Sequence, residues 1–380
     1  MNILYLCSEY PPFAPQGGIG TVTKCLAESL VLKGHNIYIT GLYNSTPKKI
    51  IKTESGVTCI LLKPWGGKRD LIDRIRLYRA VRKIIREHQI DLIEAPDFTG
   101  ITALWPKLPI PVILRLHGSS TFLLTEQSHV PSRYFKFFET RALKQADVLI
   151  GVSNYILKRT REIFTIASKS NYVIYNGVKT TESIQHLNND TNSVVFSGTL
   201  MRLKGVFSLI KAWNIVHIKI PEAHLHIYGK NSFDSNGSVL EQLQAMLADN
   251  AKDTVTFHGH VDQKVLCESL LKAKLAVFPS YTESLGMAPL EAMAAGCPTI
   301  FTKAASGPEV ISDMVDGILI DPDQPAEIAD KILFCFQNRK KAKRLGENGY
   351  KKVVEKFNLN DIITQNETMY RQIIKNRQHS

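Results

Sequence analysis

The sequence has no apolar run long enough to cross a bilayer as a helix, and no basic segment precedes its first apolar run. Its six cysteines are widely scattered, and none of them forms a Cys-x-x-Cys pair. These absences argue against a membrane-spanning protein, a disulfide-rich secreted domain and a zinc ribbon. We therefore expect a reduced, cytoplasmic protein without a signal peptide.

Positive charge is what the chain has in excess, since 47 Lys and Arg residues face 35 Asp and Glu residues, for a net charge of +12. Such an excess suits a polyanionic neighbour, which could be anionic lipid, nucleic acid or a phosphate-bearing substrate, but it can also serve solubility alone. The sequence shows no aromatic-interleaved RNA motif and no DNA-recognition helix, so we expect no nucleic-acid partner.

Short apolar runs alternate with longer helical patterns along the 380 residues, and this order begins again after residue 193. Runs such as 2–7, 36–41 and 223–228 predict strands, and their alternation with helices predicts parallel sheets covered on both faces. The chain is longer than one core usually allows, and a polar stretch at 183–193 separates the halves. We predict an α/β protein whose domains comprise residues 1–185 and 186–358, followed by a helix within 359–380.

The most informative segment lies between Glu283 and Glu291, two carboxylates eight positions apart. An apolar strand at 275–278 precedes it, and Gly286 and Pro289 open a helix between the carboxylates. Free backbone N–H groups at a helix start attract phosphate, whereas carboxylates accept hydrogen bonds from sugar hydroxyls. A nucleotide sugar combines these chemical groups, because it has a ribose, a diphosphate and a hexose.

Other polar motifs also follow predicted strands. Gly17 and Gly18 follow the first strand, His117 follows an apolar run at 113–116, and Lys204 follows another at 194–197. In open parallel sheets, ligands bind beyond the carboxyl ends of the strands. These positions therefore favour a binding site made from loops, independently of any family resemblance.

The Glu283 to Glu291 segment resembles the Glu-x7-Glu motif of the retaining glycosyltransferases of family 4. Further motifs similar to those of the family occur in the same order: Glu9-Tyr-Pro-Pro, Gly17-Gly-Ile-Gly, Leu32-Lys-Gly-His, Arg115-Leu-His-Gly, Ala146-Asp-Val-Leu-Ile-Gly-Val-Ser, Ile174-Tyr-Asn-Gly-Val, Ser197-Gly-Thr-Leu and Ile227-Tyr-Gly. The resemblance implies the GT-B fold, in which two Rossmann-like, doubly wound domains face each other across a cleft. It also implies that the domain at 1–185 binds the acceptor, that the domain at 186–358 binds the nucleotide sugar, and that the helix at 359–380 crosses back onto the first domain.

The resemblance also implies roles for single residues. In the family, the residue at Glu291 binds the ribose hydroxyls, and the residue at Glu283 contacts the transferred sugar; an N-cap is the structural alternative for Glu283. Lys204 would bind the diphosphate. The backbone N–H groups proposed for the same diphosphate belong to Leu285, Gly286, Met287 and Ala288.

One position departs from the family, because Thr199 stands where the family usually has an arginine. Arg202 lies close enough in the sequence to supply the missing cation, which would help to neutralise a leaving diphosphate. Two cations at the diphosphate would stabilise the charge that develops as the glycosidic bond breaks.

Residues of the first half would complete the site by resemblance. The loop of Gly17 and Gly18 would border the diphosphate and the acceptor, and an ordinary turn is the alternative. His117 would lie near the donor sugar, and a structural histidine is its alternative. Asp97, at the end of another strand, would either face the acceptor or cap a loop.

The function implied is transfer of a hexose, with retention, from a nucleotide-diphosphate sugar to a glycan or glycolipid acceptor in surface polysaccharide or lipopolysaccharide synthesis. The family favours UDP as the nucleotide, and we expect no metal and no other cofactor. The alternatives are a soluble acceptor, as in sucrose-phosphate or trehalose-type synthases, a sugar-nucleotide epimerase, and a protein that binds nucleotide sugars without turnover.

A basic face is predicted on the helix at 71–88. Its cations recur at helical spacing, at Arg76, Arg79, Lys83 and Arg86. Beside them runs an apolar stripe that we expect to pack on the sheet: Leu71, Ile75, Tyr78, Val81 and Ile85. With a second basic and aromatic cluster at 133–138, this face would place the protein at an anionic membrane surface, and a merely solvated face is the alternative.

Overall fold

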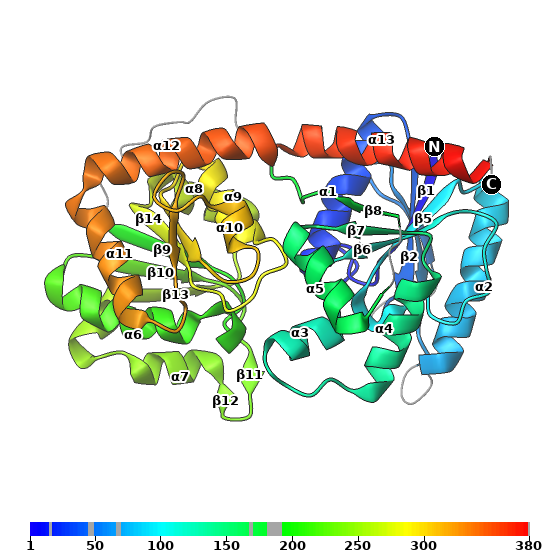
Figure 1. The fold of residues 1–380 in the computed structure, drawn as a ribbon. Coiled ribbons are helices and arrows are strands. Elements are labelled where there is room, and N and C mark those ends of the chain that lie inside the picture. The colour runs from blue at the N-terminus through cyan, green and yellow to red at the C-terminus, as the bar shows by residue number, and fades with distance from the viewer. Residues whose placement is uncertain (15–16, 45–48, 66–69, 167–169, 181–191, 379–380) are drawn as a thin grey trace. The chain divides into compact units, whose positions relative to one another are not determined.

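The computed structural model describes residues 1–14, 17–44, 49–65, 70–166, 170–180 and 192–378. The chain forms two compact units, of which unit 1 comprises residues 1–176 and 360–380 and unit 2 comprises residues 177–359. Each unit has its own sheet flanked by helices, as the alternating pattern predicted (Figure 1). The predicted boundary between residues 185 and 186 falls within 181–191, outside the described residues, whereas the units divide between Asn176 and Gly177.

Unit 1 is built on an eight-stranded sheet in the order β3-β4-β2-β1-β5-β6-β7-β8. Its strands are β1 (Asn2–Leu6), β2 (Asn36–Leu42), β3 (Lys49–Lys52), β4 (Thr58–Leu62), β5 (Leu92–Pro96), β6 (Val112–Leu116), β7 (Val148–Gly151) and β8 (Asn171–Val173). Its helices are α1 (Gly18–Leu32), α2 (Asp70–His88), the 3-10 helix η1 (Phe98–Gly100), α3 (Ser120–Glu126), α4 (Arg133–Gln145), α5 (Asn154–Phe164) and α13 (Leu359–Gln378). Only β3 pairs antiparallel, with β4 at one edge, and the order of connection reverses between β1 and β5.

Unit 2 is built on a six-stranded parallel sheet in the order β13-β10-β9-β14-β15-β16, with a separate hairpin of β11 and β12. Its strands are β9 (Ser193–Ser197), β10 (His224–Tyr228), β11 (Phe233–Asp234), β12 (Gly237–Ser238), β13 (Val255–Gly259), β14 (Leu275–Phe278), β15 (Thr299–Thr302) and β16 (Ile318–Ile320). Its helices are η2 (Arg202–Lys204), α6 (Val206–Lys219), α7 (Val239–Met246), η3 (Asp249–Thr254), α8 (Gln263–Lys272), α9 (Met287–Ala294), α10 (Gly307–Val310), α11 (Pro325–Gln337) and α12 (Arg339–Lys356). The order of connection reverses between β9 and β14, which makes their carboxyl ends the topological switch point of this sheet.

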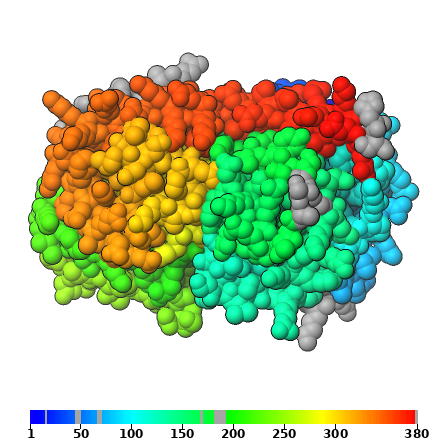
Figure 2. All heavy atoms as spheres, in the orientation of Figure 1, coloured from blue at the N-terminus to red at the C-terminus, as the bar shows by residue number. Residues whose placement is uncertain are grey.

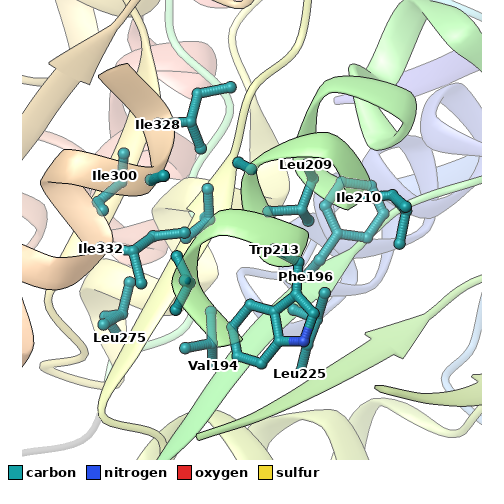
Figure 3. Close-up of a cluster of buried hydrophobic side chains, with 14 of the residues drawn as sticks. Val194, Phe196, Leu209, Ile210, Trp213, Leu225, Leu275, Ile300, Ile328 and Ile332 are labelled. Carbon is teal, nitrogen blue, oxygen red and sulfur yellow. The ribbon is translucent and has the colours of Figure 1, made fainter. Parts of the chain in front are cut away.

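A buried hydrophobic cluster fixes the strand that precedes this switch point. Trp213 of α6 is fully buried, and its indole N–H donates to Thr254 Oγ1 at 3.0 Å. Val194 of β9, Leu225 of β10 and Ile332 of α11 lie in the same cluster and are fully buried (Figure 3). Each such side chain contributes about 1.5–3 kcal/mol when it leaves water. The loop after β9 is therefore mounted on a rigid support.

A buried polar network joins α13 to three strands of unit 1. Arg115 of β6 donates from Nε and Nη2 to the two carboxylate oxygens of Glu94, at 2.6 and 3.0 Å. The same Nη2 donates to Asn366 Oδ1 at 2.5 Å, and the Tyr370 hydroxyl donates to Glu94 at 2.6 Å. Tyr5 of β1 lies 3.1 Å from that hydroxyl. Arg115 thus has a structural role, because its cation neutralises the buried Glu94 carboxylate and links the sheet to Asn366 of α13.

The predicted apolar stripe of α2 is only partly correct. Val81 and Ile85 are buried as expected, whereas Leu71 and Ile75 are 51% and 52% exposed. The reason is that Arg74 takes the inward position in the first turns of the helix, where it donates to the carbonyl oxygens of Thr99 and Gly100. No helix among the described residues has the length and apolar character that crossing a membrane requires.

Replacing Arg115 by Met should destabilise the protein by about 3–5 kcal/mol, because Glu94 would remain buried without its cation. Urea unfolding followed by circular dichroism measures this change. Arg371→Met is the control, since the Arg371 side chain is 60% exposed and its partner Glu367 keeps the cation of Lys33, so the change should cost about 1 kcal/mol at most. Equal losses in the two variants would contradict a structural role for the buried network.

Candidate active site

Two charged side chains meet where the loops after β9 and β14 come together in unit 2. Lys204, at the end of η2, places Nζ 2.6 Å from Glu283 Oε1. Ser280 donates its hydroxyl to the same carboxylate oxygen at 2.9 Å. The side chains of Lys204 and Glu283 are 29% and 15% exposed, so the pair is partly shielded but still reachable by a ligand. The structure therefore brings together two residues that lie 79 positions apart in the sequence.

Glycine allows these two loops to approach each other. Gly205 has a φ of 68°, and a Cβ atom there would lie 1.7 Å from the carbonyl oxygen of Pro279. Any other residue would be strained in backbone conformation and would also overlap that oxygen. The N–H of Tyr281 then donates to the carbonyl oxygen of Leu203 at 2.9 Å, which fastens the loops backbone to backbone.

The start of α9 has the features of an anion site. Gly286 is the N-cap residue, with a φ of 95°, and as a glycine it has no side chain with which to cap the helix, whose first turn has no acidic residue. By contrast, Ser119 and Ser153 cap α3 and α5. The N-cap alternative for Glu283 is therefore wrong, because its side chain is directed to Lys204 instead. The N–H groups in the first turn of α9 form the positive end of the helix dipole, which attracts phosphate.

Ser306 holds the backbone on which this site depends. Its hydroxyl lies 3.0 Å from the carbonyl oxygen of Glu283 and 3.1 Å from that of Leu285, and it donates toward both. Ser306 comes from the loop after β15, so nothing in the sequence near Glu283 indicates it. The local signal for Ser280 was present but weak, since it is a serine three positions before Glu283.

Glu291 lies on α9 and is half-buried. Burial raises the pKa of its carboxyl group to about 7, and a hydrogen bond with Gln263 opposes the rise only in part. Met287 and Ala288 form the first turn of the same helix. The carboxylate and the free helix start thus belong to one short element, as the motif predicted.

Arg202 contacts residues outside the Lys204–Glu283 ion pair. Its Nε lies 3.2 Å from Asp234, its Nη2 donates to Gln242 at 3.1 Å, and its guanidinium stacks 4.1 Å from the centre of the Phe207 ring. These contacts tie the loop to the β11–β12 hairpin and to α7. They give Arg202 a structural use, while its side chain remains 58% exposed.

In unit 1, Glu9 occupies the start of α1. Its Oε1 accepts the N–H of Gly20 at 3.0 Å, and a Cβ atom at Gly17 would lie 2.2 Å from its Oε2. A Cβ atom at Gly18 would instead meet open space. A side chain at Gly17 would therefore have to displace the end of the Glu9 side chain, whereas one at Gly18 would displace nothing among the described residues.

Two buried carboxylates hold the loop after β6. Asp97 is 1% exposed and accepts the N–H groups of His117 and Gly118, at 3.0 and 3.2 Å. Glu139 accepts those of Ser120 and Thr121, at 2.9 and 3.0 Å. These contacts favour loop capping over acceptor binding for Asp97, whose burial raises its pKa to about 7.

His117 is half-buried on the same loop. Burial and the nearby Arg115 cation lower its pKa to about 3, so the imidazole is neutral at pH 7. A neutral imidazole can donate one hydrogen bond and accept another, but it brings no positive charge to a phosphate. Among the described residues, no group of three or more His, Cys, Asp or Glu side chains is arranged to hold a metal ion.

Comparison with known proteins places this geometry in a family. Residues 16–182 match the family described as glycosyltransferase family 4, and residues 178–352 match the one described as glycosyl transferases group 1. An uncharacterized glycosyltransferase of Methanocaldococcus jannaschii is 30% identical over 287 residues, which are 74% of this chain and 76% of that protein.

Solved structures show the same fold at lower identity. Sucrose-phosphate synthase from Thermosynechococcus elongatus superimposes with a TM-score of 0.83 at 20% identity, over 99% of this chain and all of that one. The Anabaena protein HepE, crystallised with UDP-glucose, gives 0.74 at 20% identity, over 97% of this chain and 99% of that one. The chain therefore belongs to glycosyltransferase family 4 and is a glycosyltransferase with the GT-B fold.

Proposed function

We propose that this glycosyltransferase moves a hexose from a nucleotide-diphosphate sugar, with UDP as the nucleotide, to a glycan or glycolipid acceptor of a cell-surface polysaccharide. The transfer retains the anomeric configuration and needs no metal. One observation carries the proposal: Lys204, Glu283 and the start of α9, whose N-cap residue is a glycine, converge at the switch point of the unit 2 sheet. The HepE structure with UDP-glucose supports the choice of nucleotide.

The chemistry assigns a distinct task to each group in unit 2. Lys204 and the N–H groups from Leu285 to Ala288 neutralise the diphosphate, which gains negative charge as the glycosidic bond breaks. Glu291 accepts the ribose hydroxyls, and Glu283 accepts hydroxyls of the transferred hexose. The acceptor attacks from the face that the diphosphate leaves, and the leaving phosphate takes the acceptor's proton. Cationic and N–H neutralisation of this kind is the reason that no metal is required.

The lipid-linked acceptor is supported by a basic apolar patch on unit 1. Its exposed apolar members are Leu71, Ile72, Ile75, Tyr134 and Phe137, and its cations are Arg79, Lys83, Arg86, Arg133, Lys136, Arg141 and Lys144. The two helices that carry it, α2 and α4, are in contact, because the Arg74 guanidinium stacks 4.4 Å from the Phe138 ring centre. Both helices reach the face shown in Figure 2. Exposed apolar side chains and cations on neighbouring helices suit the interface of an anionic bilayer.

A soluble acceptor is the second candidate. The observation that favours it is the superposition with sucrose-phosphate synthase, whose TM-score of 0.83 covers 99% of this chain. The donor site would be the same in both cases. The behaviour of the basic apolar patch toward lipid therefore decides between the two acceptors.

A nucleotide panel tests the donor and the role of Glu291 together. UDP at a hundred times its dissociation constant should stabilise the protein by about 2.7 kcal/mol in a thermal-shift assay. GDP and ADP at the same concentration should stabilise it less. Glu291→Gln should weaken UDP binding about 10- to 100-fold, because it loses hydrogen bonds to a charged acceptor. Glu268→Gln, an exposed change on α8, is the control.

The same assay has a pH dependence with a definite sign. The pKa of Glu291 is about 7, so the carboxylate that accepts two hydroxyls is replaced by the protonated acid as the pH falls from 8 to 6. UDP affinity should therefore decrease toward pH 6 more steeply in the wild type than in Glu291→Gln, with an added slope of at most about tenfold per pH unit. The terminal phosphate of UDP, with a pKa of about 6, still titrates in both proteins. An unchanged affinity in Glu291→Gln would remove this residue from the ribose site.

Lys204→Ala should lower turnover at least about 100-fold, equivalent to roughly 2.7 kcal/mol of transition-state stabilisation. Initial rates of donor consumption measure the loss. Lys252→Ala, which removes a cation from an exposed pair with Asp249, should leave the rate unchanged. Full activity of Lys204→Ala would refute its phosphate role, and loss of wild-type activity in EDTA would refute metal independence.

Arg202→Ala belongs to the same series. Because its guanidinium is engaged by Asp234 and Gln242, we expect a loss below about tenfold. A loss equal to that of Lys204→Ala would instead show that Arg202 supplies the cation missing at Thr199.

The protein should sediment with vesicles that contain phosphatidylglycerol and remain free with phosphatidylcholine alone. Arg79→Glu with Lys83→Glu should release it without changing UDP affinity, because each cation contributes about 1 kcal/mol at an anionic surface. The matched control is Lys341→Glu with Lys343→Glu, an equal charge change on α12 of unit 2. If the α2 variant still sediments at low salt, the patch is only solvated and a soluble acceptor becomes the better proposal.

A further inference from the structure

The ion pair between Lys204 and Glu283 joins two groups that the proposed function assigns to different parts of the donor. Lys204 would hold the diphosphate, and Glu283 would hold the hexose. In the structure, however, the carboxylate lies 2.6 Å from the ammonium nitrogen, at the distance of a charge-assisted hydrogen bond. The cation meant for phosphate is therefore already neutralised by a residue of the same site.

We propose that Glu283 is an internal competitor for the diphosphate: its carboxylate and the diphosphate bind the same ammonium group of Lys204. The carboxylate leaves that group when a nucleotide sugar binds and returns to it when the nucleoside diphosphate is the product. This inference rests on the proposed function, because it takes Lys204 as the diphosphate cation. It adds to that function a means of favouring the donor over the product.

The competition follows from the charges. A lysine ammonium has three donors, so geometry alone would let it serve a carboxylate and a phosphate together. The two anions would then lie on opposite sides of one cation, only a few ångströms apart, in a partly shielded site where repulsion is weakly screened. The carboxylate and the diphosphate therefore compete for the same ammonium group, and charge alone does not decide between them.

The surroundings of Glu283 permit this exchange without moving the loop. Its backbone carbonyl is held by the Ser306 hydroxyl, as is that of Leu285, so the chain stays in place while the side chain turns. Ser280 offers the displaced carboxylate a hydrogen bond, since it already donates to Oε1 at 2.9 Å. One rotation of a side chain is enough to open the phosphate position.

The sugar decides whether the displaced state is stable. The hydroxyls of a donor hexose can donate to the freed carboxylate and compensate for the lost ion pair. A nucleoside diphosphate has no hexose, so its binding leaves Glu283 without that compensation. The ion pair then re-forms and weakens the hold on the product, which makes Glu283 a determinant of donor-against-product affinity.

Calorimetric titration with UDP and with inorganic pyrophosphate tests the proposal. Pyrophosphate serves as a probe that does not depend on the nucleobase. Glu283→Gln keeps the shape of the side chain and removes its charge, so it should bind both probes about tenfold more tightly than the wild type does. Asp249→Asn removes the same charge from the exposed pair with Lys252 at 2.7 Å in unit 2, and it should change neither affinity by more than about twofold.

Repeating the titrations in a variant that lacks the Lys204 cation distinguishes competition for that cation from a general effect of removing a negative charge. In Lys204→Met, the further change Glu283→Gln should no longer tighten UDP or pyrophosphate, because the cation for which they compete is gone. Product inhibition by UDP should strengthen in Glu283→Gln alone, while its turnover falls through loss of the sugar contact. An equal gain in both backgrounds would overturn the proposal.

The outcomes distinguish this proposal from the proposed function. If the wild type binds UDP and turns over donor but Glu283→Gln binds UDP and pyrophosphate no more tightly, the internal competition is refuted and the transferase function stands. If neither protein binds pyrophosphate or any nucleotide of the panel, the proposed function fails, and the competition fails with it.

Discussion

The close approach of two loops at the switch point of unit 2 is the constraint on which the candidate site depends. It requires a glycine at position 205 for two reasons. The backbone there is left-handed, and the Pro279 carbonyl oxygen fills the space that a side chain would need. Once the loops are joined, Lys204 from one and Glu283 from the other fall within 2.6 Å. A lysine and a glutamate far apart in sequence thus become one electrostatic unit, and the buried cluster around Trp213 keeps the first loop's strand in place.

Much of the fold could be predicted from the sequence because strand-helix alternation has strong periodic signals. The runs at 2–7, 36–41 and 223–228 correspond to β1, β2 and β10 within about two residues. β3 could not be predicted, since its Lys-Ile-Ile-Lys sequence is short and gains its order by pairing at an edge with β4. The exposed start of α2 could not be predicted either, because it depends on Arg74 finding carbonyl acceptors in another segment.

Parts of the candidate site could also be predicted from the sequence, and other parts could not. Its position could be predicted, because a motif at the carboxyl end of a strand must lie at that edge of the sheet. Its internal pairing could not, because Glu283 can cap a helix, contact a sugar or pair with a lysine with equal chemical sense. The roles of Ser306 and Glu139 depend on loops distant in sequence, and only the packed chain brings them to the backbone groups that they hold.

A common physical theme links the two units, because carboxylates occupy groups that would otherwise attract external anions. Glu9 takes an N–H at the start of α1, and Asp97 and Glu139 take four N–H groups after β6. At α9 the arrangement differs, since the N-cap residue is a glycine and the nearby carboxylate of Glu283 holds Lys204 instead. A glycine-rich loop before a helix is therefore not enough to make a phosphate site. What matters is whether the protein's own carboxylates have already filled it, and whether, as at Glu283, a ligand can displace them.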